Sequence, residues 1–286
     1  MTDVKIGIIG GSGVYEIEGA KYIKEIKLKT PFGEPSEAVK IIEINGIPVA
    51  FLPRHGIGHR YSPAELNYRA NIYLLKKIGI EKILAISACG SLKEEIKPRD
   101  FVIPDQIYDR TKSRASTFFD RGVVVHVGFA EPYCNELRKV LYETTKSLDL
   151  PVHNGGTYVC IDGPQFSSKA ESKVYRSLGF SIIGMTNLPE AKLAREAEMC
   201  YASIGLATDY DVWKEGEEVS VEKVIENMHI LTANVKKVIK SVVTKIKDST
   251  NCSCKDALKY AIITDPKVIS STTKKRLEPL ISKYIK

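Results

Sequence analysis

The sequence of 286 residues has one tryptophan, no internal repeat, no low-complexity segment and no apolar run of about 18 residues. Without such a run we expect no transmembrane helix and no membrane partner. The chain passes from Met1-Thr2-Asp3-Val4-Lys5 directly into the apolar run Ile6 to Ile9, without a basic n-region or a cleavage site. We therefore expect no signal peptide and a cytoplasmic location.

Several nucleotide-binding and hydrolase motifs are missing. Gly10-Gly11-Ser12-Gly13 does not continue into G-x-G-x-x-G, because Tyr15 and Glu16 follow, and it lacks the lysine of a P-loop. The sequence contains no G-x-S-x-G motif, which argues against the serine nucleophile of an α/β-hydrolase.

The formal charge is +7, and residues 251–286 carry eight Lys/Arg against three Asp/Glu. The excess positive charge therefore lies mainly in the tail. A nucleic-acid surface would need interleaved aromatic residues or a recognisable module, and the sequence has neither. We expect a solvated basic helix face and no nucleic-acid partner.

Strand-like and helix-like runs alternate along the chain. The runs that read as strands are 4–9, 41–43, 49–52, 82–87, 101–104, 157–161, 181–185 and 206–208. The runs that read as helices are 64–78, 132–148, 188–204 and 221–246. This alternation predicts a mainly parallel sheet with helices on both faces, and the Asn45-Gly46 hairpin makes it mixed; its second strand, with Pro48, is expected at an edge.

The expected architecture is thus α/β, a single domain with a mixed β-sheet flanked by helices. Residues 1–250 would form this domain, with 247–251 as a linker. Residues 251–286 would form a helical extension packed on it.

Four strand ends carry small residues or hydrogen-bond donors suited to an anion. They are Gly10-Gly11-Ser12-Gly13, Arg54-His55-Gly56, Ser87-Ala88-Cys89-Gly90-Ser91 and Gly184-Met185-Thr186. Each has an ordinary alternative: a tight turn, a surface basic cluster or a helix N-cap. Because strand ends of such sheets meet at one edge, the four together predict a phosphate pocket. No metal-ligand spacing accompanies them.

Asp209 and Asp211 end a fifth strand and flank Tyr210. In an extended chain these carboxyl groups point the same way. Two neighbouring carboxylates repel, so the pKa of one would rise and allow it to act as a proton donor. The alternative is a helix cap beside a solvent-exposed charge.

The order and sequence of eight segments resemble the 5′-methylthioadenosine phosphorylases of the purine nucleoside phosphorylase superfamily. The segments, spread over residues 5–240, are IGIIGGSGVYE, TPFGEPS, LPRHGIGHRYSPAELNYRAN, SACGSL, HVGFAEPYC, GPQFSSKAES, GMTNLPEAKLAREAEMCYA and TDYDVWKEGEEVSVEKV.

The resemblance implies a role for each part of the pocket. The phosphate-binding residues would be Gly11, Ser12, Arg54, His55, Ser87, Ala88 and Thr186. The ribose and purine contacts would come from Met185, Phe166, Ser167, Asp209 and Asp211, and the methylthio slot from Val221, Val224, His126 and a neighbouring chain. Asp209 stands where enzymes for 6-oxopurines carry Asn, which implies a preference for adenine.

The implied reaction is phosphorolysis of 5′-methylthioadenosine to adenine and 5-methylthioribose 1-phosphate, with adenosine as a possible second substrate. Asp209 would be the acid that protonates the leaving base. No metal or cofactor is required, and inorganic phosphate is a co-substrate. The shared pocket implies a homotrimer or homohexamer. The alternatives are a broader purine nucleoside phosphorylase and a regulatory module that binds nucleotides without turnover.

Six cysteines are present. Cys252-Ser253-Cys254 resembles a motif of the archaeal thermophile members of this family, which implies a thermophilic source. A Cys134–Cys200 bridge and a strained Cys252–Cys254 ring are candidate disulfides, since intracellular hyperthermophile proteins do form them. A zinc site at Cys252-Ser253-Cys254 is disfavoured, because one intervening residue is shorter than the usual spacing and no second Cys/His pair lies nearby in sequence.

Overall fold

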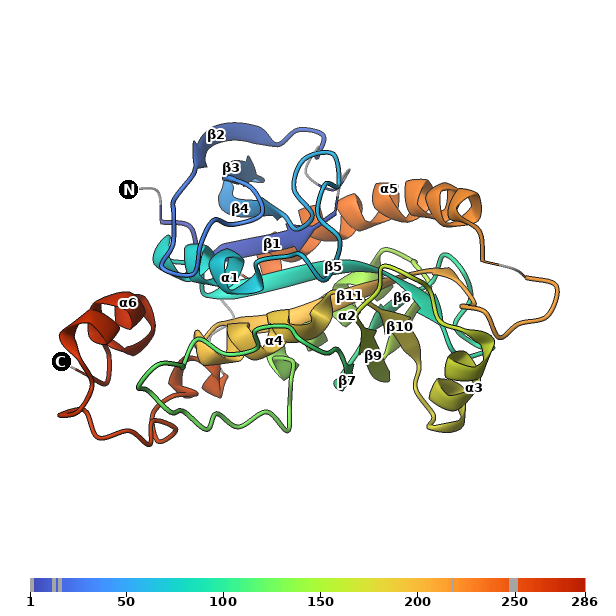
Figure 1. Cartoon of the computed structure of the whole chain (residues 1–286). Helices are drawn as coiled ribbons and strands as arrows, with labels where there is room; N and C mark the ends of the chain where they lie inside the picture. The colour runs from blue at the N-terminus through green and yellow to red at the C-terminus, as the bar shows by residue number, and fades with distance from the viewer. Residues whose placement is uncertain (1–2, 12–13, 15–16, 218, 247–251, 286) are drawn as a thin grey trace.

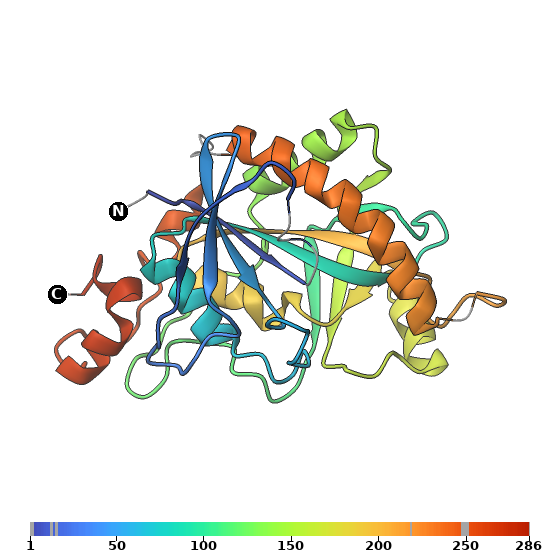
Figure 2. The ribbon, with the colours of Figure 1, turned by 90° about the horizontal axis from the view of Figure 1, so that it is seen from above.

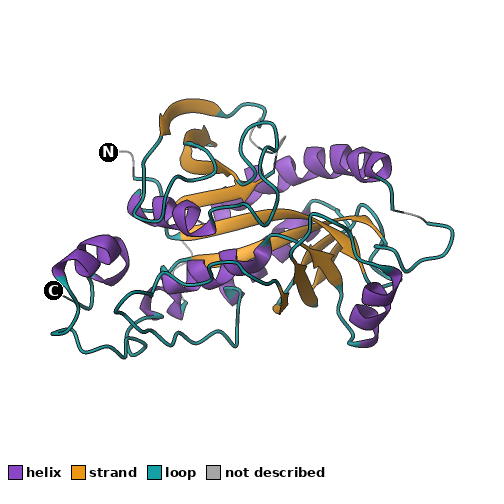
Figure 3. Cartoon of the chain, in the orientation of Figure 1, coloured by secondary structure: helices purple, strands orange, loops and turns teal. Residues whose placement is uncertain are grey.

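The computed structural model describes residues 3–11, 14, 17–217, 219–246 and 252–285. Its centre is a twisted mixed sheet, with helices on either side (Figures 1 and 3). The described strands are β1 Ile6–Gly10, β2 Lys21–Ile26, β3 Val39–Ile44, β4 Ile47–Pro53, β5 Lys82–Ser91, β6 Phe101–Ile103, β7 Gln106–Arg110, β8 Val152–Asn154, β9 Thr157–Ile161, β10 Ile182–Gly184 and β11 Cys200–Asp209. The helices are α1 Tyr68–Lys77, α2 Asn135–Ser147, α3 Lys169–Ser177, α4 Asn187–Glu196, α5 Val221–Ile246 and α6 Ser271–Ile281, with a short 3₁₀ helix η1 Ser253–Asp256.

The sheet runs in the order β2-β3-β4-β1-β5-β10-β9-β7. β11 branches from β5 and pairs with β6, which in turn pairs with β8. β5 pairs in parallel with both β1 and β11, so these three buried strands form its centre. Two hydrophobic clusters lie on its two faces. One contains residues of α1, α4 and α6, and the other contains residues of α2 and α5. Figure 2 shows α5 crossing the sheet obliquely. The expected α/β architecture with a mixed sheet is confirmed.

The hairpin prediction is confirmed, but the position of its second strand is not. Ile44 pairs with Ile47 around Asn45-Gly46, and both turn residues have positive φ, as a tight hairpin requires. β4 then lies between β3 and β1, not at an edge. Pro48 is tolerated there because the β1 ladder begins only at Val49, so the missing N–H falls outside it.

The helix predicted over 188–204 is confirmed in its first half, but its predicted end is wrong. α4 ends at Glu196, and after a turn with Glu198 at φ 56° the chain enters β11 at Cys200. The helical spacing of Tyr201 and Ile204 was misleading: Tyr201 packs in one hydrophobic cluster and Ile204 in the other.

The chain after η1 contacts the rest of the protein at several points. Ile262 forms a β-bridge with Val125, and Arg276 pairs with Asp120. The buried Glu198 accepts hydrogen bonds from the Leu258 N–H at 2.9 Å and the Tyr284 hydroxyl at 2.6 Å. Within the described residues, no helix has both the length and the apolar character to cross a bilayer.

Candidate active site

A cavity of about 1040 Å³ opens where β1, β4, β5, β10 and β11 end, and α5 forms one of its walls. It gathers nearly all of the residues that the sequence assigned to one pocket. Those present in its lining are Gly11, Arg54, His55, Ser87, Ala88, Phe166, Ser167, Met185, Thr186, Asp209, Asp211 and Val224. Ser12 lies outside the described residues, so its predicted contact with phosphate stays a prediction.

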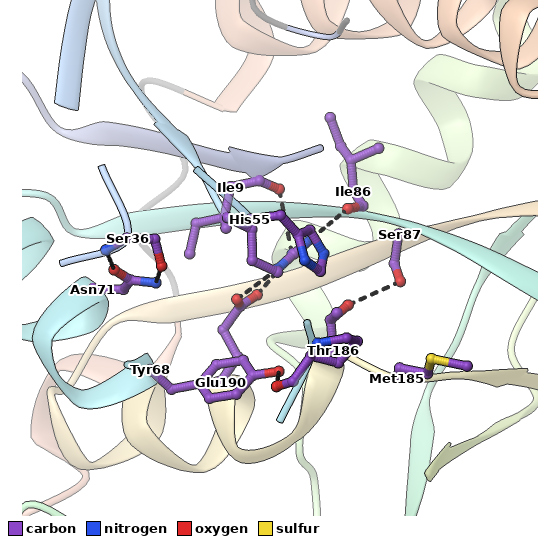
Figure 4. Close-up of polar contacts among 12 residues, drawn as sticks. Ile9, Ser36, His55, Tyr68, Asn71, Ile86, Ser87, Met185, Thr186 and Glu190 are labelled. Atoms are coloured by element: carbon purple, nitrogen blue, oxygen red, sulfur yellow. Dashed lines mark hydrogen bonds and ion pairs between the residues drawn. The ribbon is translucent and has the colours of Figure 1, made fainter. Parts of the chain in front are cut away.

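Two hydroxyl groups meet at one end of this cavity. The oxygens of Ser87 and Thr186 are 3.1 Å apart (Figure 4). The Ser87 oxygen is also 3.2 Å from the Tyr158 hydroxyl. The hydroxyls can rotate to donate to an anion. Tyr158 is buried, and its contact with Ser87 makes Tyr158, Ser87 and Thr186 one hydrogen-bonded chain.

Arg54 is buried beneath this end, and its fork is already occupied. Nε and Nη2 donate to the two carboxylate oxygens of Glu190 at 2.8 and 2.9 Å. Nη1 donates to Ile86 O at 2.8 Å, and Nη2 also approaches Ile9 O at 3.4 Å. Although burial opposes ionisation, the charge and hydrogen bonds of Glu190 raise the pKa of Arg54. Of five guanidinium N–H groups, one on Nη1 is left for a ligand, so Arg54 can give the expected anion a single hydrogen bond and not a bidentate pair.

His55 is poised as a neutral acceptor. Its Nδ1 lies 2.9 Å from Tyr61 O, and because a carbonyl only accepts, Nδ1 carries the proton. Burial, followed by the charge of Arg54, lowers the pKa of His55 to about 4. Nε2 therefore presents a lone pair, which suits the P–OH of monohydrogen phosphate. The sequence predicts His55 among the donors to the anion, and the structure makes its Nε2 an acceptor instead.

Asp209 lies at the other end of the cavity, aimed by a bulge. Ala207 pairs with Cys89 and Asp209 with the next residue, Gly90, so Thr208 is an extra residue in β11. The carboxylate accepts from the Thr208 hydroxyl at 2.6 Å and from the Asp211 N–H at 2.8 Å. Burial outweighs these hydrogen bonds and raises the pKa of Asp209.

Asp211 lines the same cavity as Asp209, but not because residues two apart in a strand point the same way. Its φ is 53°, so the chain has already turned out of the extended conformation. Its Oδ2 is buried and has no well-placed partner among the described residues, and the same holds for the Ser167 hydroxyl. Burial raises the pKa of Asp211 to about 6, although the nearby hydroxyl of Ser172 opposes the shift. An unsatisfied buried oxygen is suited to a ligand N–H.

Two residues expected at the methylthio slot lie outside this cavity lining. Val221 is at the exposed first turn of α5, one turn before Val224, and is 59% exposed. His126 follows the bridge to the tail, and its backbone N–H donates to Ala261 O at 2.9 Å. A contact from His126 to a substrate would have to reach the cavity of a neighbouring chain.

The structure also brings in residues that the motifs did not single out. Glu190 and Tyr158 hold Arg54 and Ser87 in place at the end of the cavity lined by the Ser87 and Thr186 hydroxyls, which we call the anion end. Met228 and His229 of α5 line the opposite wall. Glu190 resembles an ordinary acidic residue in the first turn of a helix, so its role had no signal in the sequence. α5 was predicted as a helix, but which of its faces covers the pocket depends on tertiary packing.

The expected disulfides are not formed. All six cysteines are free, and both Cys134 and Cys200 lie outside the helices predicted for them, Cys134 as the residue before α2 and Cys200 as the first residue of β11. The sulfur atoms of Cys200 and Cys252 lie 3.2 Å apart.

Known proteins place this fold and cavity in one class. A family model described as the phosphorylase superfamily matches residues 5–244. S-methyl-5'-thioadenosine phosphorylase of Geobacter sulfurreducens is 51% identical over 98% of this chain and 99% of its own length. A crystal structure of methylthioadenosine phosphorylase sourced from an Antarctic soil metagenomic library has a TM-score of 0.94 and 46% identity, and covers 98% of this chain and 100% of that one.

A mutant form of the Adenosine/Methylthioadenosine Phosphorylase from Schistosoma mansoni, in complex with methylthioadenosine, has a TM-score of 0.84 and 35% identity. The match covers 90% of this chain and 96% of that one. Because these similarities extend over nearly the full length, the chain belongs to the S-methyl-5'-thioadenosine phosphorylase family of the phosphorylase superfamily.

Proposed function

We propose that this protein catalyses phosphorolysis of 5′-methylthioadenosine, giving adenine and 5-methylthioribose 1-phosphate. The observation that carries the proposal is one cavity with two chemically distinct ends. Hydroxyls of Ser87 and Thr186 line one end, and the carboxyl groups of Asp209 and Asp211 line the other. The relatives from Geobacter sulfurreducens and Antarctic soil are named for this activity, which supports the substrate.

Phosphate binds at the hydroxyl end. Ser87, Thr186 and the remaining N–H of Arg54 donate to its oxygens, and the bare Nε2 of His55 accepts from its P–OH. The backbone at Gly11 and Ala88 has no bulky side chain to block close approach. The lysines of α5 that line the same cavity, Lys236, Lys237 and Lys240, add a positive field that favours an anion.

The adenine ring binds at the carboxyl end. Its N7 gains electron density as the C–N bond breaks, and a protonated Asp209 donates to it. The exocyclic amine donates to the unsatisfied Oδ2 of Asp211. Burial raises the pKa of both carboxyl groups, so the pair retains a proton more readily than exposed carboxylates would. Phe166 and Ser167 border the base, and Met185 borders the sugar.

The sugar carbon between the two ends becomes cation-like as adenine leaves, and the oriented phosphate attacks it from the opposite face. Phosphate is already nucleophilic, so the protein contributes position and electrostatic stabilisation. The apolar residues Val224, Ile225 and Met228 of α5 border the same space and suit a methylthio group. Apolar walls reject an added hydroxyl only weakly, so adenosine is expected as a slower substrate.

The proposal extends to assembly and chemistry outside the described residues. Ile225 lines the cavity yet is 52% exposed, and neighbouring Val221 is also exposed, so an adjoining chain would complete the slot in a homotrimer or homohexamer. We expect that chain to contribute its His126 to the slot, and we expect Ser12 to contact phosphate. The enzyme is expected to act without a cofactor and in the cytoplasm.

The test is release of adenine from 5′-methylthioadenosine with and without inorganic phosphate. We expect adenine and 5-methylthioribose 1-phosphate in equal amounts only when phosphate is present. Release of adenine without phosphate would make the protein a nucleosidase. Tight binding without turnover would make it a regulatory binding module, and a faster reaction with inosine would make it a broader purine nucleoside phosphorylase.

A further inference from the structure

Four thiol groups from three distant parts of the sequence meet at one point in the structure. The sulfur atoms of Cys134, Cys200, Cys252 and Cys254 all lie within 4.8 Å of one another. Cys134 and Cys254 are buried, and the other two are half-buried. Ordinary packing of cysteine in a core does not require four sulfur atoms to converge.

Backbone hydrogen bonds hold three of these residues in place, and Cys252 directly precedes η1. Cys134 immediately precedes α2, and its N–H donates to Tyr201 O at 2.8 Å. Cys200 opens β11, and its N–H donates to Glu81 O at 2.8 Å. Cys254 lies in η1, where its carbonyl accepts from the Ala257 N–H at 3.3 Å. The four side chains thus leave a helix start, a strand start and a short turn toward a common centre.

This arrangement has the size of a tetrahedral thiolate site. A zinc ion bound to four sulfur atoms at about 2.3 Å places neighbouring sulfurs about 3.8 Å apart, which falls within the spread of this cluster. Four soft ligands around one centre favour zinc over a hard cation such as magnesium. We propose that Cys134, Cys200, Cys252 and Cys254 bind one Zn²⁺ ion as a closed, four-coordinate structural site.

The surroundings favour thiolates at this position. The positive end of α2 lies beside Cys134. Lys82 is the register partner of Cys200 in the parallel pair β5–β11, and its buried ammonium donates to Ile246 O. A zinc ion with four thiolates carries a net charge of −2, and the N-terminus of α2 offsets part of it. The short spacing of Cys252 and Cys254 is no obstacle, because the other two ligands come from residues 134 and 200.

The site lies at the opposite end of β11 from the cavity. Cys200 is its first residue and Asp209 its last, about 30 Å apart along the strand. Four protein ligands leave no open position for water or substrate, so the metal has a structural role. The metal links η1 to α2 and β11, and it thereby also anchors the chain between η1 and α6. Its binding energy therefore adds to folding stability, not to the chemistry at Asp209.

The experiment measures the metal content of the full-length protein. The protein is produced with zinc in the growth medium, purified under nitrogen without chelator or affinity tag, and analysed by mass spectrometry for metals. We expect about one zinc per chain. The variant Cys252→Ser with Cys254→Ser should fall below a tenth of that content, whereas Cys160→Ala should keep it, because Cys160 is buried on β9 outside the cluster.

A second measurement does not depend on how well the variants fold. The unmodified protein is freed of zinc and reduced under nitrogen, and then titrated with Co²⁺. Four thiolate ligands should give intense sulfur-to-cobalt absorption and tetrahedral bands that saturate at one equivalent and vanish when Zn²⁺ is added. Protein isolated without zinc overturns the proposal, whether its thiols are free or paired in disulfides. Cobalt binding without thiolate absorption overturns it as well.

Discussion

Replacing Glu190 with Gln tests whether the buried ion pair with Arg54 orders the anion end. Glu190 accepts two hydrogen bonds from Arg54, at 2.8 and 2.9 Å, and one from the Tyr201 hydroxyl at 2.9 Å. Both charged side chains are almost fully buried. In Glu190→Gln the guanidinium keeps its charge, because Arg is not deprotonated in proteins, and loses its counter-charge.

Removing one partner of a buried ion pair costs about 3–5 kcal/mol. Gln retains one acceptor oxygen, so we expect about 3 kcal/mol less stability. For a chain of this size each kcal/mol lowers Tm by about 2–4 °C, which predicts a fall of about 6–12 °C. The KM for phosphate should rise as well, since the remaining N–H of Arg54 is no longer held in place.

The assay is thermal unfolding beside Glu196→Gln, a matched control on the same helix. Glu196 is also buried, but its partners are the neutral Thr117 hydroxyl and Phe118 N–H, both at 2.7 Å. Burial raises the pKa of Glu196 to about 7, so much of it is already uncharged at neutral pH, and an amide should cost only about 1 kcal/mol. Equal losses in the two variants would refute the reasoning.

Two further predictions follow from buried groups. Burial raises the folded-state pKa of Glu196 from its ordinary value of 4.5 to about 7, so the folded state binds more protons than the unfolded state between these pH values. The free energy of unfolding should therefore decline as pH rises from about 4.5 to 7. Chemical denaturation should show a flatter pH dependence in Glu196→Gln, and a dependence identical to that of the wild type would contradict the assignment. A methyl group on Gly184 would collide with the Tyr158 hydroxyl and disturb its contact with Ser87, whereas Gly128 borders open space. Gly184→Ala should therefore lower kcat/KM at least about tenfold, by analogy with other misplaced polar contacts, and Gly128→Ala should not; equal activity of the two variants would count against the role of Ser87.

The central part of the fold could be predicted from the sequence because its signals are local. The apolar run at Ile6–Gly10 and the Asn45-Gly46 turn each specify one structure. The boundary between α4 and β11 could not be predicted in the same way. Leu193, Ala197, Tyr201 and Ile204 fit a helical stripe, yet the chain turns at Glu198, a residue without the usual glycine signal for a left-handed conformation.

The residues of the site were predictable in kind but not in detail. Strand ends and the Asp pair indicated a two-ended pocket, and the structure brings them together. The sequence could not show that the Arg54 guanidinium donates two hydrogen bonds to Glu190, 136 residues away. Nor could it show that a hydrogen bond to Tyr61 O makes His55 Nε2 an acceptor. These contacts depend on tertiary packing, as does the meeting of Cys134 with Cys254.

The most direct measurement of the central claim compares adenosine with inosine in wild-type protein and in Asp209→Asn, at saturating phosphate. Loss of a positioned proton donor should lower kcat/KM for adenosine by about 10²-fold or more. The Asn amide suits a 6-oxopurine, so the ratio of inosine to adenosine turnover should rise. An unchanged ratio would contradict the assignment of Asp209 as the acid that reads adenine.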